Sequence, residues 1–218
     1  VLRGDLFIRG SGDPTISGRF AEDARSIFRQ WADSLRAHGV TRVEGGIVGI
    51  DSAFPAPSLG PGWAWDDLSY GYAAEYGALQ FNEGVVRLQV IPSRTVGSPP
   101  VVVLDPPAQH VRIYNLAETG PAGSPVELDF QRDEAGPGIT ISGTLPADTV
   151  LVSRTLAVRD PTAYFVSVLR ETLRESGIMV EGQALPAERW PRESWRSTTQ
   201  MGVRDWCWRE SPGNSRPR

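Results

Sequence analysis

The chain contains no lysine, since all 22 of its basic residues are arginine. A Schiff-base lysine, a P-loop lysine and a lysine general base are therefore excluded. Histidine occurs only as His38 and His110, and Cys207 is the single cysteine. One cysteine cannot form an intramolecular disulfide or a cysteine-rich zinc site. We therefore expect no cofactor and no metal ion.

Long hydrophobic runs and a basic surface are also missing from the sequence. No apolar run reaches the roughly 20 residues of a membrane helix, so we predict no membrane span. The net charge is −4, whereas nucleic-acid binding requires a basic patch, and we expect no nucleic-acid partner. The remaining composition is that of a globular protein, and 23 glycines and 18 prolines favour many turns over a helical bundle.

The two ends of the sequence differ from its middle. Val1 is not an initiator methionine, a strand-like run follows at once, and no signal peptide is visible. We therefore expect a further part of the protein upstream. Residues 191–218 are rich in tryptophan and arginine, and we interpret them as a truncated or aberrant tail. Residues 205–218 show no hydrophobic period, so we predict no fixed structure there.

Hydrophobic periodicity predicts two segments in which a strand follows a helix. Asp160 and Pro161 suit the N-cap and the first position of the second helix. The first helix lies between two strands, which is the pattern of a β-α-β unit. The predicted elements are strand 5–9, helix 20–38 and strand 43–50, then helix 161–176 and strand 178–182.

Short strands separated by proline and glycine turns occupy the region between these segments. Their spacing of about ten residues is typical of a small all-β domain. We therefore predict an α/β (α+β) accessory domain formed by residues 1–84 and 155–190, with residues 85–154 inserted as a β-rich domain. The six predicted strands are 85–91, 101–104, 111–116, 126–130, 138–143 and 149–153.

Asp51 is the main candidate for a binding residue. It ends the strand 43–50, and ligands of α/β sheets bind outside the carboxyl ends of the strands. An aspartate that only caps a turn is the alternative interpretation. The sequence GSGDP at Gly10–Pro14 predicts a tight turn with an Asx-type bond, because it matches neither the dinucleotide nor the P-loop motif.

An aromatic and acidic stretch begins at Trp63. It can form a sugar-binding platform, or it can anchor a long loop on the protein body, because tryptophan and tyrosine bury area while keeping a polar group. Asp66 and Asp67 are adjacent, but consecutive residues of an extended chain point to opposite sides, so they do not form a glycosidase pair. The stretch comprises Trp63, Trp65, Asp66, Asp67, Tyr70, Tyr72 and Tyr76.

No complete catalytic site is present in the sequence. A serine triad requires a base beside the serine, and only His38 and His110 are available. We expect His38, in the last turn of the first helix, to act as a partner of the helix dipole. The G-x-S-x-G turn of α/β-hydrolases is also missing. We therefore predict no catalytic residue in this chain.

Three stretches of the sequence together resemble one enzyme family. Residues 2–16, 60–83 and 156–182 are similar to the accessory region of class C low-molecular-mass penicillin-binding D-alanyl-D-alanine carboxypeptidases/endopeptidases. The resemblance implies a serine penicillin-recognising domain interrupted by an α/β domain, which itself carries a smaller β-rich domain. It also implies a peptidoglycan stem peptide as partner and a periplasmic or extracellular location. By the same resemblance, Asp51 is the acidic residue that meets the free amine of the diaminopimelyl side chain.

The catalytic motifs of that family are missing from this chain. S-x-x-K and K-[TS]-G require lysine, and none of Asn82, Asn115 and Asn214 has a serine two positions earlier, which excludes S-x-N. We therefore expect a fragment of a cell-wall carboxypeptidase/endopeptidase that lacks most of the penicillin-recognising domain and is itself inactive. The alternative is a non-catalytic secreted module that binds peptidoglycan or glycan.

Overall fold

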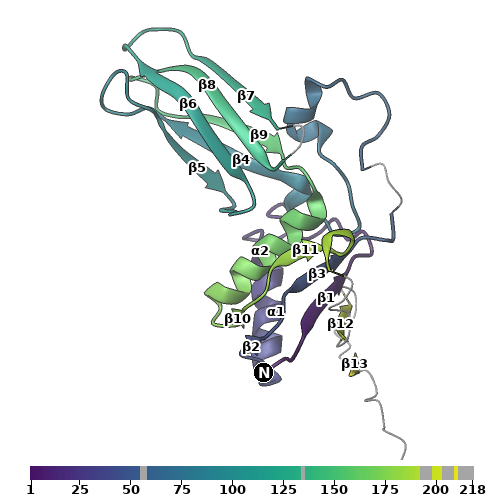
Figure 1. Cartoon of the computed structure of the whole chain (residues 1–218). Helices are drawn as coiled ribbons and strands as arrows, with labels where there is room; N and C mark the ends of the chain where they lie inside the picture. The colour runs from purple at the N-terminus through teal and green to yellow at the C-terminus, as the bar shows by residue number, and fades with distance from the viewer. Residues whose placement is uncertain (55–57, 134–135, 192–197, 203–208, 211–218) are drawn as a thin grey trace, which may run out of the picture. The chain divides into compact units, whose positions relative to one another are not determined.

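The computed structural model describes residues 1–54, 58–133, 136–191, 198–202 and 209–210 (Figure 1). The chain mixes helices and strands and divides into two compact units. The first, which we call the α/β unit, comprises Val1–Ala56, Gly77–Phe81 and Pro161–Arg218. The second, the β-rich unit, comprises Pro57–Tyr76 and Asn82–Asp160.

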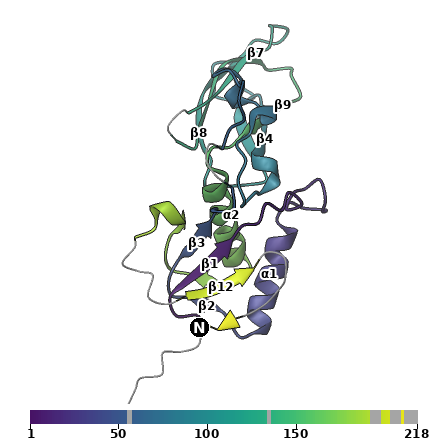
Figure 2. The ribbon, with the colours of Figure 1, turned by 90° about the vertical axis from the view of Figure 1, so that its right-hand side faces the viewer.

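A mostly parallel sheet forms the centre of the α/β unit. Strand β1 pairs in parallel with β3 on one side and with β12 on the other, as Figure 2 shows. Helix α1 lies between β1 and β3 in the chain, which confirms the predicted β-α-β unit. The strand order is β11 (Ala184–Pro186), β3 (Ile47–Ile50), β1 (Asp5–Arg9), β12 (Thr198–Gly202) and β13 (Arg209–Glu210).

Helix α1 (Ser26–Ala37) is shorter at its start than the predicted helix 20–38. The Asp23 carboxylate accepts a hydrogen bond from the Arg25 backbone N–H at 2.7 Å, and the Asp23 carbonyl accepts one from Ser26 N–H at 3.0 Å. These bonds form a turn before the helix, so the first helical turn begins only after Asp23. Phe20, the first apolar residue of the predicted helix 20–38, is therefore 60% exposed.

The predicted strand 43–50 is interrupted in the structure. Strand β2 (Arg42–Val43) pairs with β10 (Met179–Val180) in a separate two-stranded sheet, while β3 joins the main sheet. The buried Asp5 carboxylate accepts a hydrogen bond from Gly46 N–H at 2.9 Å, between the two strands. Glycine is required here, since a Cβ atom on Gly46 would overlap the Gln183 backbone.

Helix α2 (Pro161–Glu175) begins at the predicted proline. Asp160 has a φ of 59°, which differs from the extended conformation typical of an N-cap. Helix α2 packs against β3, β11 and α1. The core of the α/β unit lies at these contacts and contains Phe28, Trp31, Phe81, Tyr164, Phe165 and Leu169.

All six strands predicted between residues 85 and 154 are present in the β-rich unit. The first sheet is antiparallel, and β6 and β8 of the second sheet are parallel. Strand β9 begins three residues later than predicted, because Thr149 N–H bonds the Pro146 carbonyl in a turn. The sheet orders are β5 (Val101–Asp105), β4 (Val85–Ile91), β9 (Val152–Ala157), and β6 (Arg112–Gly120), β8 (Gly138–Pro146), β7 (Glu127–Arg132).

The unit boundaries differ from the predicted boundaries at residues 82–84, at residues 155–160 and, over the longest stretch, at residues 57–76. All of these residues belong to the β-rich unit, whereas the sequence predicted them in the α/β domain. Ser69 Oγ accepts a hydrogen bond from the Arg132 backbone N–H at 3.0 Å, and Glu75 forms an ion pair with the Arg132 guanidinium at 3.2 Å. Contacts to β7, remote in the sequence, therefore fix the position of this segment.

Part of the C-terminal range lies outside the described residues. Within 205–218, the structure describes Arg209–Glu210, which pair antiparallel with β12 as strand β13. The prediction of no fixed structure is wrong for these two residues, because backbone pairing needs no hydrophobic period. In the described part of the chain, no helix has the length and apolar character required to cross a membrane.

Candidate functional site

Asp51 lies at the edge of the main sheet where β1 and β3 end. The GSGDP turn follows β1 at the same edge, and Gly10 N–H donates a hydrogen bond to the Ile50 carbonyl at 2.9 Å. Gly12 N–H donates to the Ala78 carbonyl at 3.0 Å, which brings residues 77–79 to this edge. A Cβ atom on Gly10 would overlap the Ala78 backbone, so the close approach requires glycine.

The GSGDP turn has the geometry that the sequence predicts. Asp13 Oδ1 accepts hydrogen bonds from the Thr15 N–H at 2.9 Å and from its hydroxyl at 2.7 Å. Gly12 has a φ of 82°, which glycine adopts without steric cost. The Asx-type turn is therefore confirmed. Its hydrogen bonds fix the conformation of the chain after β1, where it leads toward α1.

The Asp51 carboxylate is half-buried and connects three segments of the α/β unit. One oxygen accepts a hydrogen bond from Thr162 Oγ1 at 2.7 Å, and the other accepts one from Ala78 N–H. Thr162 is the second residue of α2, where the helix dipole favours a negative charge. A Cβ atom on Gly77 would lie 2.6 Å from Asp51 Oδ2, so glycine leaves the room that the carboxylate occupies.

These contacts give Asp51 a structural role that joins distant segments, whereas the alternative interpretation of the sequence was an aspartate that only caps a local turn. An ionised carboxylate accepts roughly four hydrogen bonds, so two acceptor positions remain for a ligand. The same carboxylate can therefore hold the segments at the sheet edge and accept a hydrogen bond from a cation. Ala78 and Thr162 were not identified as partners from the sequence, because they lie 27 and 111 residues away.

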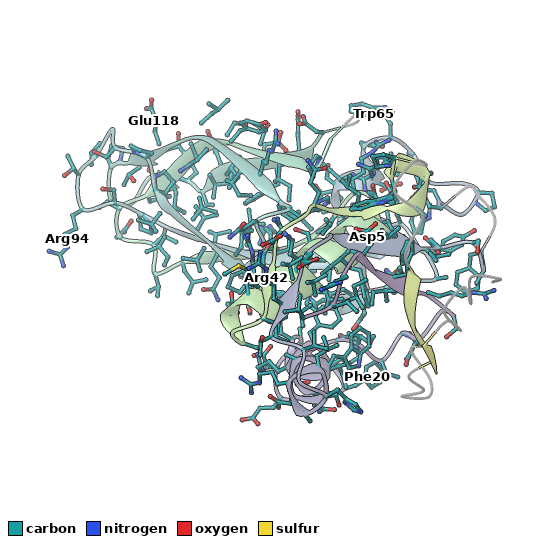
Figure 3. The ribbon with its side chains drawn as sticks, turned by 60° about the horizontal axis from the view of Figure 1, so that its bottom comes forward. Asp5, Phe20, Arg42, Trp65, Arg94 and Glu118 are labelled. Carbon is teal, nitrogen blue, oxygen red and sulfur yellow. The ribbon has the colours of Figure 1, made fainter. Side chains whose placement is uncertain are left out.

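The aromatic and acidic stretch forms an exposed cluster on the β-rich unit. Trp65 is 79% exposed and Tyr72 is 61% exposed, and Figure 3 places Trp65 at the surface. The hypothesis that the rings anchor the loop is wrong for these two residues. Ser69 and Glu75 hold the segment instead, through Arg132. The exposed rings belong to Trp63, Trp65, Tyr70, Tyr72 and Tyr76.

Contacts among the side chains order this cluster. The Tyr70 and Tyr72 rings are nearly parallel, with an interplanar angle of 11° and centroids 5.6 Å apart. The Trp63 ring lies 5.6 Å from the Tyr72 ring at 40°. The Tyr72 hydroxyl donates a hydrogen bond to Asp67 Oδ1 at 2.8 Å, and this bond raises the pKa of Tyr72 above 10.0. Asp66 is exposed beside these rings.

Both histidines of the chain lie close to backbone carbonyl groups. His38 Nδ1 lies 2.8 Å from the Ser34 carbonyl oxygen, which confirms its expected place at the end of α1. His110 Nε2 lies 3.2 Å from the Arg159 carbonyl oxygen in the β-rich unit. Cys207 lies outside the described residues. Among the residues that the structure describes, no three histidine, cysteine, aspartate or glutamate side chains are placed to hold a metal ion.

A buried ion pair in the β-rich unit was not found from the sequence. The Glu75 and Arg132 side chains are 9% and 4% exposed, and the second Glu75 oxygen accepts a hydrogen bond from Asp160 N–H at 3.0 Å. Burial lowers the pKa of Arg132, and the nearby Glu75 charge opposes this change. No local pattern signals the pair, because its members are 57 residues apart.

Comparison with known proteins identifies relatives that match most of the chain. The chain is 33% identical over 184 residues to a D-alanyl-D-alanine carboxypeptidase from Actinomadura sp. (strain R39), covering 82% of this chain and 33% of that protein. It is 22% identical over 188 residues to the D-alanyl-D-alanine carboxypeptidase DacB of Haemophilus influenzae, covering 84% and 37%. The chain thus spans about a third of the length of these curated relatives.

Solved structures show the same fold. The crystal structure of penicillin binding protein 4 (dacB) from Haemophilus influenzae matches with a TM-score of 0.65 at 18% identity, over 85% of this chain and 40% of that chain. Its complex with a β-lactam matches with a TM-score of 0.54 at 18% identity, over 84% and 37%. Residues 1–194 match the family described as D-Ala-D-Ala carboxypeptidase 3 (S13), and the chain belongs to this family.

Proposed function

We propose that this chain is the central insertion region of a serine-type peptidoglycan D-alanyl-D-alanine carboxypeptidase/endopeptidase. The family match over residues 1–194 is the observation that supports this function. Peptidoglycan is a cell-wall polymer, so the intact enzyme works in the periplasm or outside the cell. Its substrate is the stem peptide. The ratio of carboxypeptidase activity, which trims stem peptides, to endopeptidase activity, which cleaves cross-links, is a property of the intact enzyme.

The chain by itself has no peptidase activity in this proposal. It lacks lysine, and S-x-x-K and K-[TS]-G therefore cannot occur in it. Loss of a serine nucleophile costs on the order of 10⁶ in turnover. We expect that purified chain incubated with a labelled penicillin forms no covalent adduct by mass spectrometry. A stoichiometric adduct would contradict the proposal.

Asp51 is proposed to contact the substrate in the intact enzyme. Its carboxylate lies at the sheet edge where ligands of α/β proteins bind, and it has acceptor positions beyond those used by Ala78 and Thr162. A carboxylate suits the free ammonium group of a diaminopimelyl side chain. A charge-assisted hydrogen bond of this kind contributes roughly 1.5 to 3 kcal/mol. Asp51 therefore sets peptide preference and takes no part in bond cleavage.

The intact enzyme carrying Asp51→Asn tests this contact. Asparagine keeps the size of the side chain and removes its charge, so KM for a diaminopimelyl peptide should rise about tenfold to a hundredfold. Acylation by a simple penicillin should stay near normal, because penicillin has no such amine. Equal losses on both substrates would show that Asp51 only holds the segments at the sheet edge.

Asp66 provides the matched control. Its carboxylate is exposed and accepts no hydrogen bond from the residues that the structure describes. In the proposed assignment, Asp66→Asn leaves KM for the diaminopimelyl peptide unchanged. A rise in KM with Asp66→Asn and none with Asp51→Asn would move the ammonium contact to Asp66 and overturn the assignment to Asp51.

A non-catalytic module that binds peptidoglycan or glycan is the second candidate function. The exposure of Trp65 and Tyr72 favours it, because rings that served only packing would be covered. The reading frames that flank the coding sequence separate the two candidates. An upstream S-x-x-K and a downstream K-[TS]-G support the carboxypeptidase, and an unrelated neighbour supports the module.

A further inference from the structure

We propose that the chain forms a symmetric dimer through the free edge of β5, which pairs antiparallel with β5 of a second copy. This interaction goes beyond the proposed peptidase function and does not depend on it. Strand β5 lies at one end of the sheet order β5, β4, β9, as Figure 1 shows. Among the residues that the structure describes, no strand pairs with its outer edge. Such an edge presents a row of N–H and C=O groups that can pair with another chain.

The side chains of β5 are strongly aliphatic for an exposed edge strand. Val101–Leu104 are four consecutive aliphatic residues, a pattern typical of a strand that is buried on both faces. None of the four is buried here, since Val101 is 57% exposed and Val103 is 42% exposed, while Val102 and Leu104 are half-buried. Edge strands are commonly protected by charges or proline, and these four positions carry neither. A second strand would cover both the edge and these side chains.

Proline on both sides of β5 fixes the register of the pairing. Pro100 precedes the strand and Pro106 follows it, and proline has no N–H to donate to a ladder. The ladder is therefore limited to the five residues of β5. The antiparallel register that uses all five places Val103 opposite its own counterpart at the two-fold axis. In this register Val102 lies opposite Leu104 of the second copy, which forms an aliphatic pair on each side of the axis.

Charges at the two ends of β5 favour the antiparallel arrangement. Asp105 ends the strand and is exposed, and its ion pair with Arg87 is loose, with 4.0 Å between the charged atoms. Arg94 follows β4 at the other end, where Ile91 pairs with Val101. Its side chain projects from the β-rich unit in Figure 3 and has no acidic partner among the described residues. Antiparallel pairing brings Arg94 of each copy toward Asp105 of the other, whereas parallel pairing would bring like charges together.

Sedimentation equilibrium of the purified 218-residue chain over a range of concentrations tests the proposal. We expect a monomer–dimer equilibrium whose dissociation constant rises at least about tenfold in Val103→Arg, because two arginines would then meet at the two-fold axis. Val150→Arg is the matched control, since Val150 is 85% exposed in the same unit and lies outside β5. It should leave the dissociation constant unchanged. A chain that stays monomeric, or a dimer that Val103→Arg weakens no more than Val150→Arg does, would overturn the proposal.

Disulfide cross-linking tests the register and stays decisive if Val103→Arg fails to fold. The single cysteine, Cys207, is first replaced by serine. Directly opposite residues of an antiparallel pair have Cα atoms about 4.5 to 5.5 Å apart, within the range of a disulfide. Val103→Cys should therefore form a covalent dimer under mild oxidation. Val101→Cys should not, because the two copies of this position would lie roughly 14 Å apart along the ladder. Cross-linking through Val101→Cys and not through Val103→Cys would overturn the proposed pairing.

Arg94→Gln tests the charge match at the ends of the strands. The dimer should weaken about twofold to thirtyfold and should depend less on salt, because each dimer loses two exposed ion pairs. Arg154→Gln is the control, since Arg154 lies on β9 at the opposite edge of the same sheet. It should leave the dissociation constant unchanged. An equally strong or stronger dimer in Arg94→Gln would overturn the antiparallel arrangement.

Discussion

At the scale of single residues, hydrogen bonds to carboxylates fix the position of several side chains and change the ionisation of one of them. Asp51, Asp67 and Glu75 each accept hydrogen bonds from two different residues. The bonds of Asp51 and Glu75 join distant parts of the chain, and those of Asp67 stay within one segment. In Asp67, the bond from Tyr72 also changes the chemistry of the partner. A phenol that donates to a carboxylate is harder to ionise, because the resulting phenolate would face a negative charge.

Tyr72 should therefore titrate above its ordinary pKa of 10.0. Asp67→Asn removes the negative charge, so the pKa of Tyr72 should fall toward the ordinary value. The stabilising effect of the bond is present below pH 10 and is lost as the pH rises through the raised pKa of the folded state. Ultraviolet titration of tyrosine ionisation, with Tyr72→Phe to assign the signal, measures the change. An identical titration curve for the unchanged chain and for Asp67→Asn would contradict the prediction.

At the scale of the elements, helix α1 contributes a small part of its surface to the core of the α/β unit, and Phe28 lies in that part. Phe28 is fully buried, with ring centroids 5.2 Å from Phe81 and 4.9 Å from Phe165 of α2. Phe20 belongs to the same sequence period, yet it lies before the helix and is exposed. The two phenylalanines thus offer a direct comparison between a core residue and a surface residue.

Phe28→Ala should lower the free energy of unfolding by about 3 to 5 kcal/mol, because it leaves a cavity among three aromatic rings. Phe20→Ala is the control and should change it by no more than about 0.5 kcal/mol. Urea unfolding, monitored by tryptophan fluorescence, measures both values, since the ring centroids of Trp31 and Phe28 are 5.4 Å apart. Similar losses for the two variants would mean that Phe20 is packed.

At the scale of the whole molecule, the two units have separate cores and separate buried charges. In the α/β unit, the nearly buried Arg25 bonds Glu171 and Glu175 of α2. In the β-rich unit, Arg132 bonds Glu75, and both side chains are buried. Each unit is therefore expected to lose its structure separately when its own core or ion pair is damaged.

Glu75→Gln should destabilise the β-rich unit by about 3 to 5 kcal/mol, because it leaves the buried Arg132 charge without its partner. Amide hydrogen exchange should accelerate in β4 to β9 and stay unchanged in β1, α1 and α2. Arg87→Gln is the control within the same unit, since the exposed Arg87–Asp105 pair at 4.0 Å contributes at most about 1 kcal/mol. Uniform acceleration across both units would show that they unfold together.

The sequence alone determined the features that depend on neighbouring residues. Hydrophobic period and turn chemistry located α2, the Asp13 turn and the six strands of the β-rich unit, because these signals are local. The absence of lysine excluded whole classes of catalysis. Three long stretches also carried the family resemblance, and the match over residues 1–194 confirms it.

Only the tertiary structure decided which distant residues meet. The Gly46 break in a strand depends on Asp5, and the assignment of residues 57–76 to the β-rich unit depends on Arg132. The partners of Asp51 and the exposure of the aromatic cluster likewise follow from packing. Such contacts join residues from 27 to 111 positions apart. Sequence periods report which face of an element is buried, and they carry no information on which distant segment covers that face.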